Sequence, residues 1–152
     1  MVVVRRGRLW TVCARGAHSA VPGGRSTSPL ERMTPRQLVQ AWVEAFNRAD
    51  VDALASFYTT DAVNHQVAET PVQGRENIRQ MFASGFASAP MHCIVENLFE
   101  DGQWAILEWR DPSGLRGCGF FRVVHGQITF QRGYWDKLSF LRLHGLPLPD
   151  RP

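Results

Sequence analysis

Asp111 is the residue of this chain best suited by its sequence context to acid–base chemistry. It follows the predicted strand Trp104–Arg110, in which alternation puts Leu107 and Trp109 on the same face as Asp111. A carboxyl group among apolar side chains is a candidate proton donor or acceptor. Asp111 also opens the tetrapeptide Asp-Pro-Ser-Gly, a typical turn with proline in second position. The catalytic and the turn interpretation both stay open.

His65 is a second candidate, because histidine is the usual proton shuttle near neutral pH. It lies between Asn64 and Gln66 in a short predicted strand, Ala62–Val67. If Asn64 and Gln66 line a pocket, strand alternation turns His65 away from it. A histidine held by structural hydrogen bonds is the alternative.

Three tryptophans, Trp42, Trp109 and Trp135, could form an aromatic wall for a planar ligand or could simply pack in the core. Gln66 and Gln131 would then orient the ligand, because small-molecule sites place a few polar groups among apolar ones. A ligand site built from these side chains is therefore expected.

The last predicted strand, Gln127–Lys137, puts Gln131 and Gly133 on one face. Gly133 either makes room for a ligand or marks a bend in the strand. Arg132 and Asp136 lie on the opposite face, where an ion pair is expected.

The chain has three cysteines, Cys13, Cys93 and Cys118. Their odd number and their spacing fit neither a disulfide framework nor a metal site. Cys93 and Cys118 are interpreted as small buried apolar groups. A reducing compartment, the cytoplasm, is the expected location. No glycine-rich phosphate loop follows a strand, so neither a cofactor nor a metal is expected.

The basic charge belongs to the first part of the chain. Residues 1–33 hold six of the 17 basic residues and one of the 14 acidic ones, which leaves 11 basic and 13 acidic residues in the rest. The expected domain, residues 34–148, is thus mildly acidic, which argues against nucleic-acid binding. No apolar run suits a membrane span. The arginine-rich leader resembles an organellar transit peptide or is a disordered extension; residues 149–152 form a tail.

Periodicity predicts the elements that position these residues. Thr34 and Gln37 form a capping box for a helix with one apolar stripe. Asp50 caps a second, short helix that reaches Tyr58. The further elements are the strand Ala62–Val67, a helix from Gly74, the strands Cys93–Phe99, Trp104–Arg110, Leu115–Val124 and Gln127–Lys137, and a terminal helix or coil, Leu138–His144. Helices followed by antiparallel hairpins indicate an α+β fold.

Three stretches resemble the SnoaL-like branch of the nuclear transport factor two-like superfamily. They run from Leu38 to Ala62, from Val63 through Gly74-Arg-Glu-Asn-Ile78, and from Gly126 to Gly145. The resemblance implies a cone-shaped α+β barrel, with a highly curved, mostly antiparallel sheet packed on three N-terminal helices. It also implies a pocket on the concave face and a homodimer formed across the outer face.

The resemblance places five catalytic positions in this chain, and most have lost their chemistry. The isomerase-like base falls at Gln66, the isomerase-like phenol at Trp42, the acid of cyclases and hydrolases at Gly133, and a hydrolase-like arginine at Trp109. Only the acid that the family has at the end of the strand Trp104–Arg110 is kept, as Asp111. The resemblance therefore leaves open whether the protein is an enzyme.

We expect a pocket for a small apolar or aromatic molecule, such as a polyketide- or steroid-like compound. Asp111 favours a cofactor-free acid–base enzyme of the isomerase, cyclase or hydrolase type. The residues at positions 66 and 133 favour a non-catalytic ligand-binding or dimeric interaction module.

Overall fold

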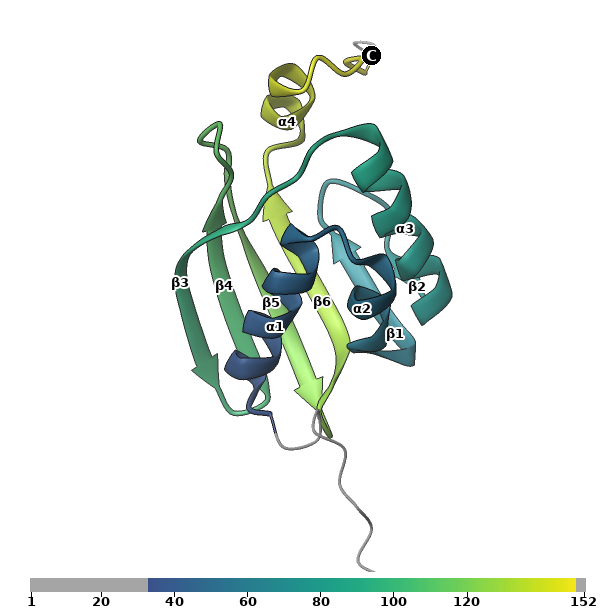
Figure 1. The fold of residues 1–152 in the computed structure, drawn as a ribbon, viewed down its shortest axis with the longest axis vertical. Coiled ribbons are helices and arrows are strands. Elements are labelled where there is room, and N and C mark those ends of the chain that lie inside the picture. Colours follow the sequence, from purple (N-terminus) through teal and green to yellow (C-terminus); the bar gives the residue numbers. More distant parts are fainter. Residues whose placement is uncertain (1–32, 150–152) are drawn as a thin grey trace, which may run out of the picture.

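The computed structural model describes residues 33–149 (Figure 1). The predicted leader, apart from Met33, and most of the predicted tail lie outside the described residues. The elements, in chain order, are α1 (Pro35–Asn47), α2 (Val51–Ser56), β1 (Tyr58–Gln66), β2 (Val72–Gln73), α3 (Arg75–Ser88), β3 (Ile94–Asp101), β4 (Trp104–Arg110), β5 (Arg116–Val124), β6 (Gln127–Trp135) and α4 (Lys137–Leu143).

The two N-terminal helices begin where the sequence predicts. The Thr34 hydroxyl accepts from the Gln37 backbone N–H, and the Gln37 side chain accepts from the Thr34 N–H, so the capping box is complete. Asp50 caps α2 by accepting from the Ala53 N–H at 3.0 Å. Each cap satisfies backbone donors that a helix start leaves without intrahelical partners.

The prediction that the second helix reaches Tyr58 is wrong. Helix α2 ends at Ser56, and Tyr58 is the first residue of β1, four positions before the predicted strand start at Ala62. Tyr58 pairs with Ile128 in β6, and the Phe57 carbonyl accepts from the Ile128 N–H at 2.7 Å. Pairing with a strand 70 residues further along the chain thus overrides the local helical pattern.

The sheet has six strands in the order β2-β1-β6-β5-β4-β3. All neighbours are antiparallel except β1 and β6, which run parallel and join the first long strand to the last. Sequence analysis missed the two-residue strand β2. The β1–β6 register places Asn64 beside Gln131 and Gln66 beside Gly133. Four polar or small residues that are far apart in sequence therefore meet on one part of the sheet.

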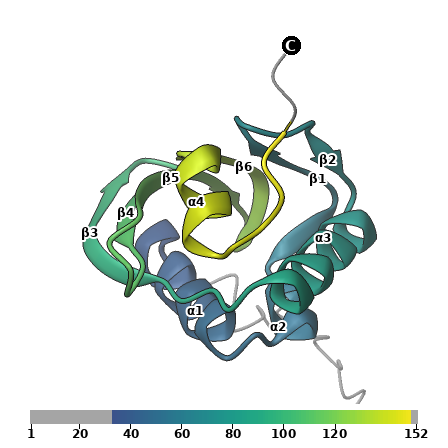
Figure 2. The same ribbon diagram turned by 90° about the horizontal axis from the view of Figure 1, so that it is seen from above.

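The sheet is strongly curved, and α1, α2 and α3 lie on its concave side (Figure 2). Register shifts interrupt the pairing of β1 with β6, of β3 with β4 and of β5 with β6. Such irregularities increase twist and bending, which a strongly curved sheet requires. The result is the cone-shaped, mainly antiparallel α+β architecture that the sequence predicts.

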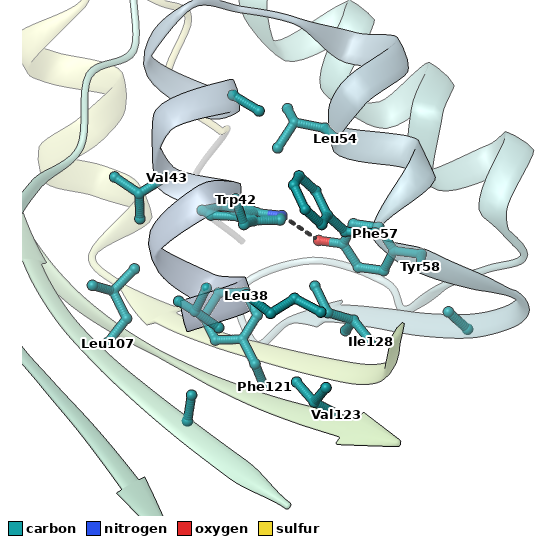
Figure 3. Close-up of a cluster of buried hydrophobic side chains, with 14 of the residues drawn as sticks. Leu38, Trp42, Val43, Leu54, Phe57, Tyr58, Leu107, Phe121, Val123 and Ile128 are labelled. Carbon is teal, nitrogen blue, oxygen red and sulfur yellow. Dashed lines mark hydrogen bonds between the residues drawn. The ribbon is translucent and has the colours of Figure 1, made fainter. Parts of the chain in front are cut away.

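The core fills the narrow part of the cone between α1, α2 and the sheet (Figure 3). Leu38, Leu54 and Ile128 have no exposed surface, and Phe121 retains 1%. The Trp42 indole lies edge-on to the Phe121 ring, with 5.2 Å between ring centroids. Burial of this apolar surface is the main force that holds the helices on the sheet.

The start of the last described helix, α4, corrects two predictions. Strand β6 ends at Trp135, and Asp136 caps α4 by accepting from the N–H groups of Leu138 and Ser139. The expected ion pair between Arg132 and Asp136 is therefore absent among the described residues. The Asp136 carboxylate serves the helix start instead, and the Arg132 guanidinium lies 5.0 Å above the centroid of the Phe130 ring.

Candidate functional site

A cavity of about 550 Å³ lies between the concave face of the sheet and the helices. Its wall is mainly apolar and draws on α1, α3, β1, β4, β5 and β6, with Phe140 from α4 and His144 directly after α4. Seen from above, α4 lies in the middle of the ring formed by the curved sheet and the helices (Figure 2). This size and lining suit a small organic molecule.

All three tryptophans that the sequence singles out lie on the wall of this cavity. Trp42 stacks on Phe46 at 5.2 Å between ring centroids, and Trp135 packs edge-on against Phe140 at 5.4 Å. The wall and core interpretations therefore both describe these side chains. That they bind a ligand stays a prediction.

Trp109 is accommodated by a glycine on the neighbouring strand. Gly117 pairs with Trp109 across β4 and β5, and a Cβ on Gly117 would lie 2.5 Å from the Trp109 ring atom Cζ2. A larger residue at position 117 would therefore displace the indole from the wall.

Gly133 makes room for a side chain of the protein itself. A Cβ on Gly133 would overlap the Oε1 atom of Gln66 and lie 2.7 Å from its Cδ atom. The Gln66 side chain thus crosses over Gly133 on the neighbouring strand. The two positions where the resemblance implies a base and an acid are consequently coupled, because the amide at one occupies the space that a side chain at the other would need.

Five side chains of the cavity wall and the fully buried Tyr58 behind it, together called the inner wall, form one continuous chain of hydrogen bonds. Its members, in order, are Trp42, Tyr58, Gln131, Asn64, Gln66 and Trp135. The donor–acceptor distances are 3.0 Å from Trp42 to Tyr58, 2.9 Å from Asn64 to Gln131, 2.7 Å from Gln66 to Asn64 and 3.0 Å from Trp135 to Gln66. The chain satisfies polar groups that would otherwise be costly to bury.

Tyr58 is the member of this chain that sequence analysis missed. Its ring is fully buried, and its hydroxyl accepts from the Trp42 indole and donates to the Gln131 side-chain oxygen (Figure 3). Burial raises the pKa of the Tyr58 phenol well above its ordinary value, although hydrogen bonding from Trp42 opposes that shift. Tyr58 is therefore a neutral structural donor. The signal that could have found it is a tyrosine just after a capped short helix, where a buried hydroxyl needs a partner.

Asp111 serves the turn and also lies on the cavity wall. One carboxylate oxygen accepts from the Leu115 N–H at 2.8 Å, and the Ser113 hydroxyl lies 2.7 Å from both oxygens. Asp111 retains 8% of its surface exposed. The structure thus confirms the turn role, whereas a part of Asp111 in catalysis stays a prediction.

Among the histidines, His65 is not part of the cavity wall, whereas its neighbours Asn64 and Gln66 are. His92 and His144 do line the cavity, and sequence analysis did not single them out. Both lie in segments without a strand pattern, so alternation could not place them.

The two cysteines within residues 33–149 are free thiols. Cys93 lines the cavity, and burial raises its pKa to about 12. Burial also raises the pKa of Cys118, with a smaller contribution from the nearby Glu108 carboxylate. Both therefore stay protonated near neutral pH. Cys93 is buried, as predicted, whereas Cys118 is only partly buried and also lines the cavity.

Among the described residues, neither a cluster of metal ligands nor a lysine or arginine lines the cavity. Within the described part of the chain, no three His, Cys, Asp or Glu residues are placed to hold a metal ion. Of the residues that line the cavity, Glu69 and Asp111 are acidic, and no lysine or arginine is among them. No described helix is both long and apolar enough to cross a membrane.

Solved structures with the same architecture come from several bacteria. A protein of ketosteroid isomerase-like fold from Catenulispora acidiphila, in complex with trimethylamine, has a TM-score of 0.66 and 21% identity, covering 79% of this chain and 100% of its own. A candidate polyketide cyclase from Xanthomonas campestris has a TM-score of 0.66 and 24% identity over 73% of this chain and 99% of its own. An epoxide hydrolase from Mycobacterium tuberculosis has a TM-score of 0.61 and 22% identity, covering 71% of this chain and 86% of its own. At these identities the similarity establishes the fold.

The architecture and these neighbours define the class as the nuclear transport factor two-like cone fold. Residues 39–131 match the SnoaL-like domain, and the chain belongs to that family. The resemblance found in the sequence is thereby confirmed. No curated protein matches the sequence significantly.

Proposed function

We propose that this protein binds a small, largely apolar molecule in the cavity between its sheet and helices. The observation that carries the proposal is the cavity of about 550 Å³, with Trp42, Trp109 and Trp135 on its wall. Such a volume accepts a molecule of a few fused rings. The polyketide- and steroid-like compounds suggested by the family resemblance have this size and polarity.

Ligand binding can be followed through the tryptophans. The full-length protein is titrated with aromatic acids, polyketides, steroids and terpenoid epoxides while tryptophan fluorescence and melting temperature are recorded. A ligand present at about 100 times its Kd should raise the melting temperature by several degrees. Absence of both responses across the panel would contradict the proposal.

A matched pair of variants locates the response. Trp109 lies on the cavity wall, whereas Trp104 lines a hollow outside it, on the outer face of the sheet. Trp109→Phe should therefore lose part of the ligand-induced quenching, and Trp104→Phe should keep it. Equal quenching in both variants would place the ligand elsewhere.

Acid–base catalysis with Asp111 is the second candidate, favoured by the position of this buried carboxylate on the cavity wall. Asp111 would hold or accept a proton at its carboxylate, and the Leu115 N–H and Ser113 hydroxyl would orient it. Asp111→Asn keeps an acceptor for the Leu115 N–H but cannot take up the proton. Turnover of a bound compound should be lost while binding remains; retained turnover would refute this role.

A homodimer formed across the outer face of the sheet is also proposed. Aromatic rings gather there: Trp104 packs edge-on against Phe130, and Phe120 against Tyr134, which is 43% exposed. The family resemblance implies a second copy as the occupant. In analytical ultracentrifugation the protein should sediment as a dimer and Tyr134→Glu as a monomer; a monomeric wild type would contradict the proposal.

A cytoplasmic location is also proposed, supported by the two free thiols within residues 33–149. Fractionation of cells that express the full chain tests it, and recovery in an organelle would favour import through the leader.

A further inference from the structure

The hydrogen bonds of the inner wall have a fixed direction, which follows from their two ends. An indole N–H can donate but cannot accept. At one end, Trp135 must therefore meet the oxygen of Gln66, so the Gln66 nitrogen donates to Asn64. The Asn64 oxygen is then occupied, and the Asn64 nitrogen donates to the oxygen of Gln131.

The other end leads to the same atom. Trp42 donates to the Tyr58 hydroxyl oxygen, which leaves the hydroxyl proton to donate to the Oε1 atom of Gln131. Both arms thus converge on one amide oxygen, which accepts two hydrogen bonds. Rotating the Gln131 amide by half a turn would set its N–H groups against both donors, so its orientation is fixed.

This convergence leaves the amide nitrogen of Gln131 free. Among residues 33–149 no group accepts a hydrogen bond from its Nε2 atom, and that atom is not among the fully enclosed polar atoms without a partner. Since Gln131 lies on the cavity wall with 5% of its surface exposed, the nitrogen is reached from the cavity. An unpaired donor in an apolar cavity is unfavourable until an acceptor meets it.

We infer that the Nε2 amide of Gln131 donates to an acceptor oxygen of the bound molecule, so that the cavity selects uncharged apolar compounds with a carbonyl group. The inference rests on the proposed function, since it requires the cavity to bind a ligand. Asp111 is acidic and none of the described wall residues is a lysine or arginine, which disfavours an anion; the other acid, Glu69, is paired with Lys137 at 2.7 Å. Tyr58 is no competing donor, because its proton is committed to Gln131.

Three probes of the same ring skeleton test this selection: α-tetralone, its parent hydrocarbon tetralin, and tetralin carboxylate. Binding of each to the full-length protein is measured by tryptophan fluorescence. One neutral hydrogen bond makes α-tetralone bind about five to ten times more tightly than tetralin. The carboxylate should bind more weakly than either.

The variant Gln131→Glu keeps an oxygen acceptor for Tyr58 and Asn64 but replaces the free N–H groups. It should therefore lose the preference for α-tetralone over tetralin, while Tyr58 and Asn64 keep their acceptor. Gln80→Glu adds the same charge on the exposed face of α3 and should keep the preference.

A measurement on the wild type does not depend on the folding of any variant. The Gln131 side-chain amide signals in a nitrogen–proton correlation spectrum should move downfield with α-tetralone, and further than the ring-current shift that tetralin causes. Equal binding of the two neutral probes, or an amide that moves no further than with tetralin, overturns the inference while leaving the proposed cavity intact. If no probe binds, the proposed function fails, and the inference fails with it.

Discussion

Replacement of Gly133 by alanine should destabilise the protein through one identified side chain. The three heavy atoms nearest to a Cβ at this position all belong to Gln66, and one of them overlaps it. Gln66 must move, and it then loses its hydrogen bonds with Asn64 and Trp135. Gly133 does not have a positive φ, so alanine introduces no backbone strain.

The magnitude follows from these two effects. Overpacking costs about 1–3 kcal/mol, and each lost hydrogen bond about 1 kcal/mol. With two hydrogen bonds lost, these costs sum to about 3–5 kcal/mol. Because the clash involves the end of the flexible Gln66 side chain, Gly133→Ala should lower the free energy of unfolding by an amount near the lower limit, about 3 kcal/mol. In a Gln66→Ala background, the side-chain atoms that a Cβ at position 133 would overlap are absent. There the same change should be neutral or stabilise by up to about 1 kcal/mol, because alanine restricts the unfolded chain more than glycine does.

Urea unfolding of the wild type, the two single variants and the double variant measures this reversal of sign. Gly102→Ala is the control, because Gly102 has a φ of 56° and no atom near its would-be Cβ. Its strain cost should be the same in both backgrounds. If Gly133→Ala destabilises the Gln66→Ala protein as much as the wild type, the coupling between strands β1 and β6 argued above is refuted.

Three further predictions concern single side chains. Because the pKa of Tyr58 is raised in the folded state, the unfolded chain loses this proton first, and stability should fall above about pH 10, by up to about 1.4 kcal/mol per pH unit. In urea unfolding at several pH values, the free energy of unfolding of Tyr58→Phe should fall less steeply above pH 10 than that of the wild type. An equal decrease in both proteins would contradict this prediction. Cys93, with its pKa raised to about 12, should resist iodoacetamide at pH 8 in the native protein and react in urea, as peptide mass spectrometry can check. Asp136→Ala removes the cap of α4 and should lower the free energy of unfolding by about 1 kcal/mol. It should also weaken ligand binding, because Phe140 and His144 on the cavity wall depend on the position of α4. Asp136→Asn, which can still cap the helix, should retain ligand binding.

The sequence predicted most of the elements because their signals are local. The capping box at Thr34 and the cap at Asp50 act within four residues, and each is present in the structure. The turn that begins at Asp111 is equally local, with its carboxylate bound to the Leu115 N–H. Tyr58 was misplaced for the complementary reason, since its strand conformation depends on a partner in β6.

The candidate site was predictable as a set of residues and not as an arrangement. The tryptophans, Asn64, Gln66, Gln131 and Asp111 could each be named from composition and alternation, and the structure places them on one cavity wall. The sequence did not show how the amides are connected. It left Gly133 as either a space for ligand or a bend, whereas the space holds Gln66.

The helix starts and the turns could be predicted from the sequence, and so could the family through its resemblance. The position of Gln66 over Gly133 and the meeting of two arms of hydrogen bonds at Gln131 follow from the folded sheet alone. Caps and turns depend on contacts within a few residues, whereas the β1–β6 register joins segments more than 60 residues apart. That register sets which polar atoms are satisfied inside the protein and which one is left for a ligand.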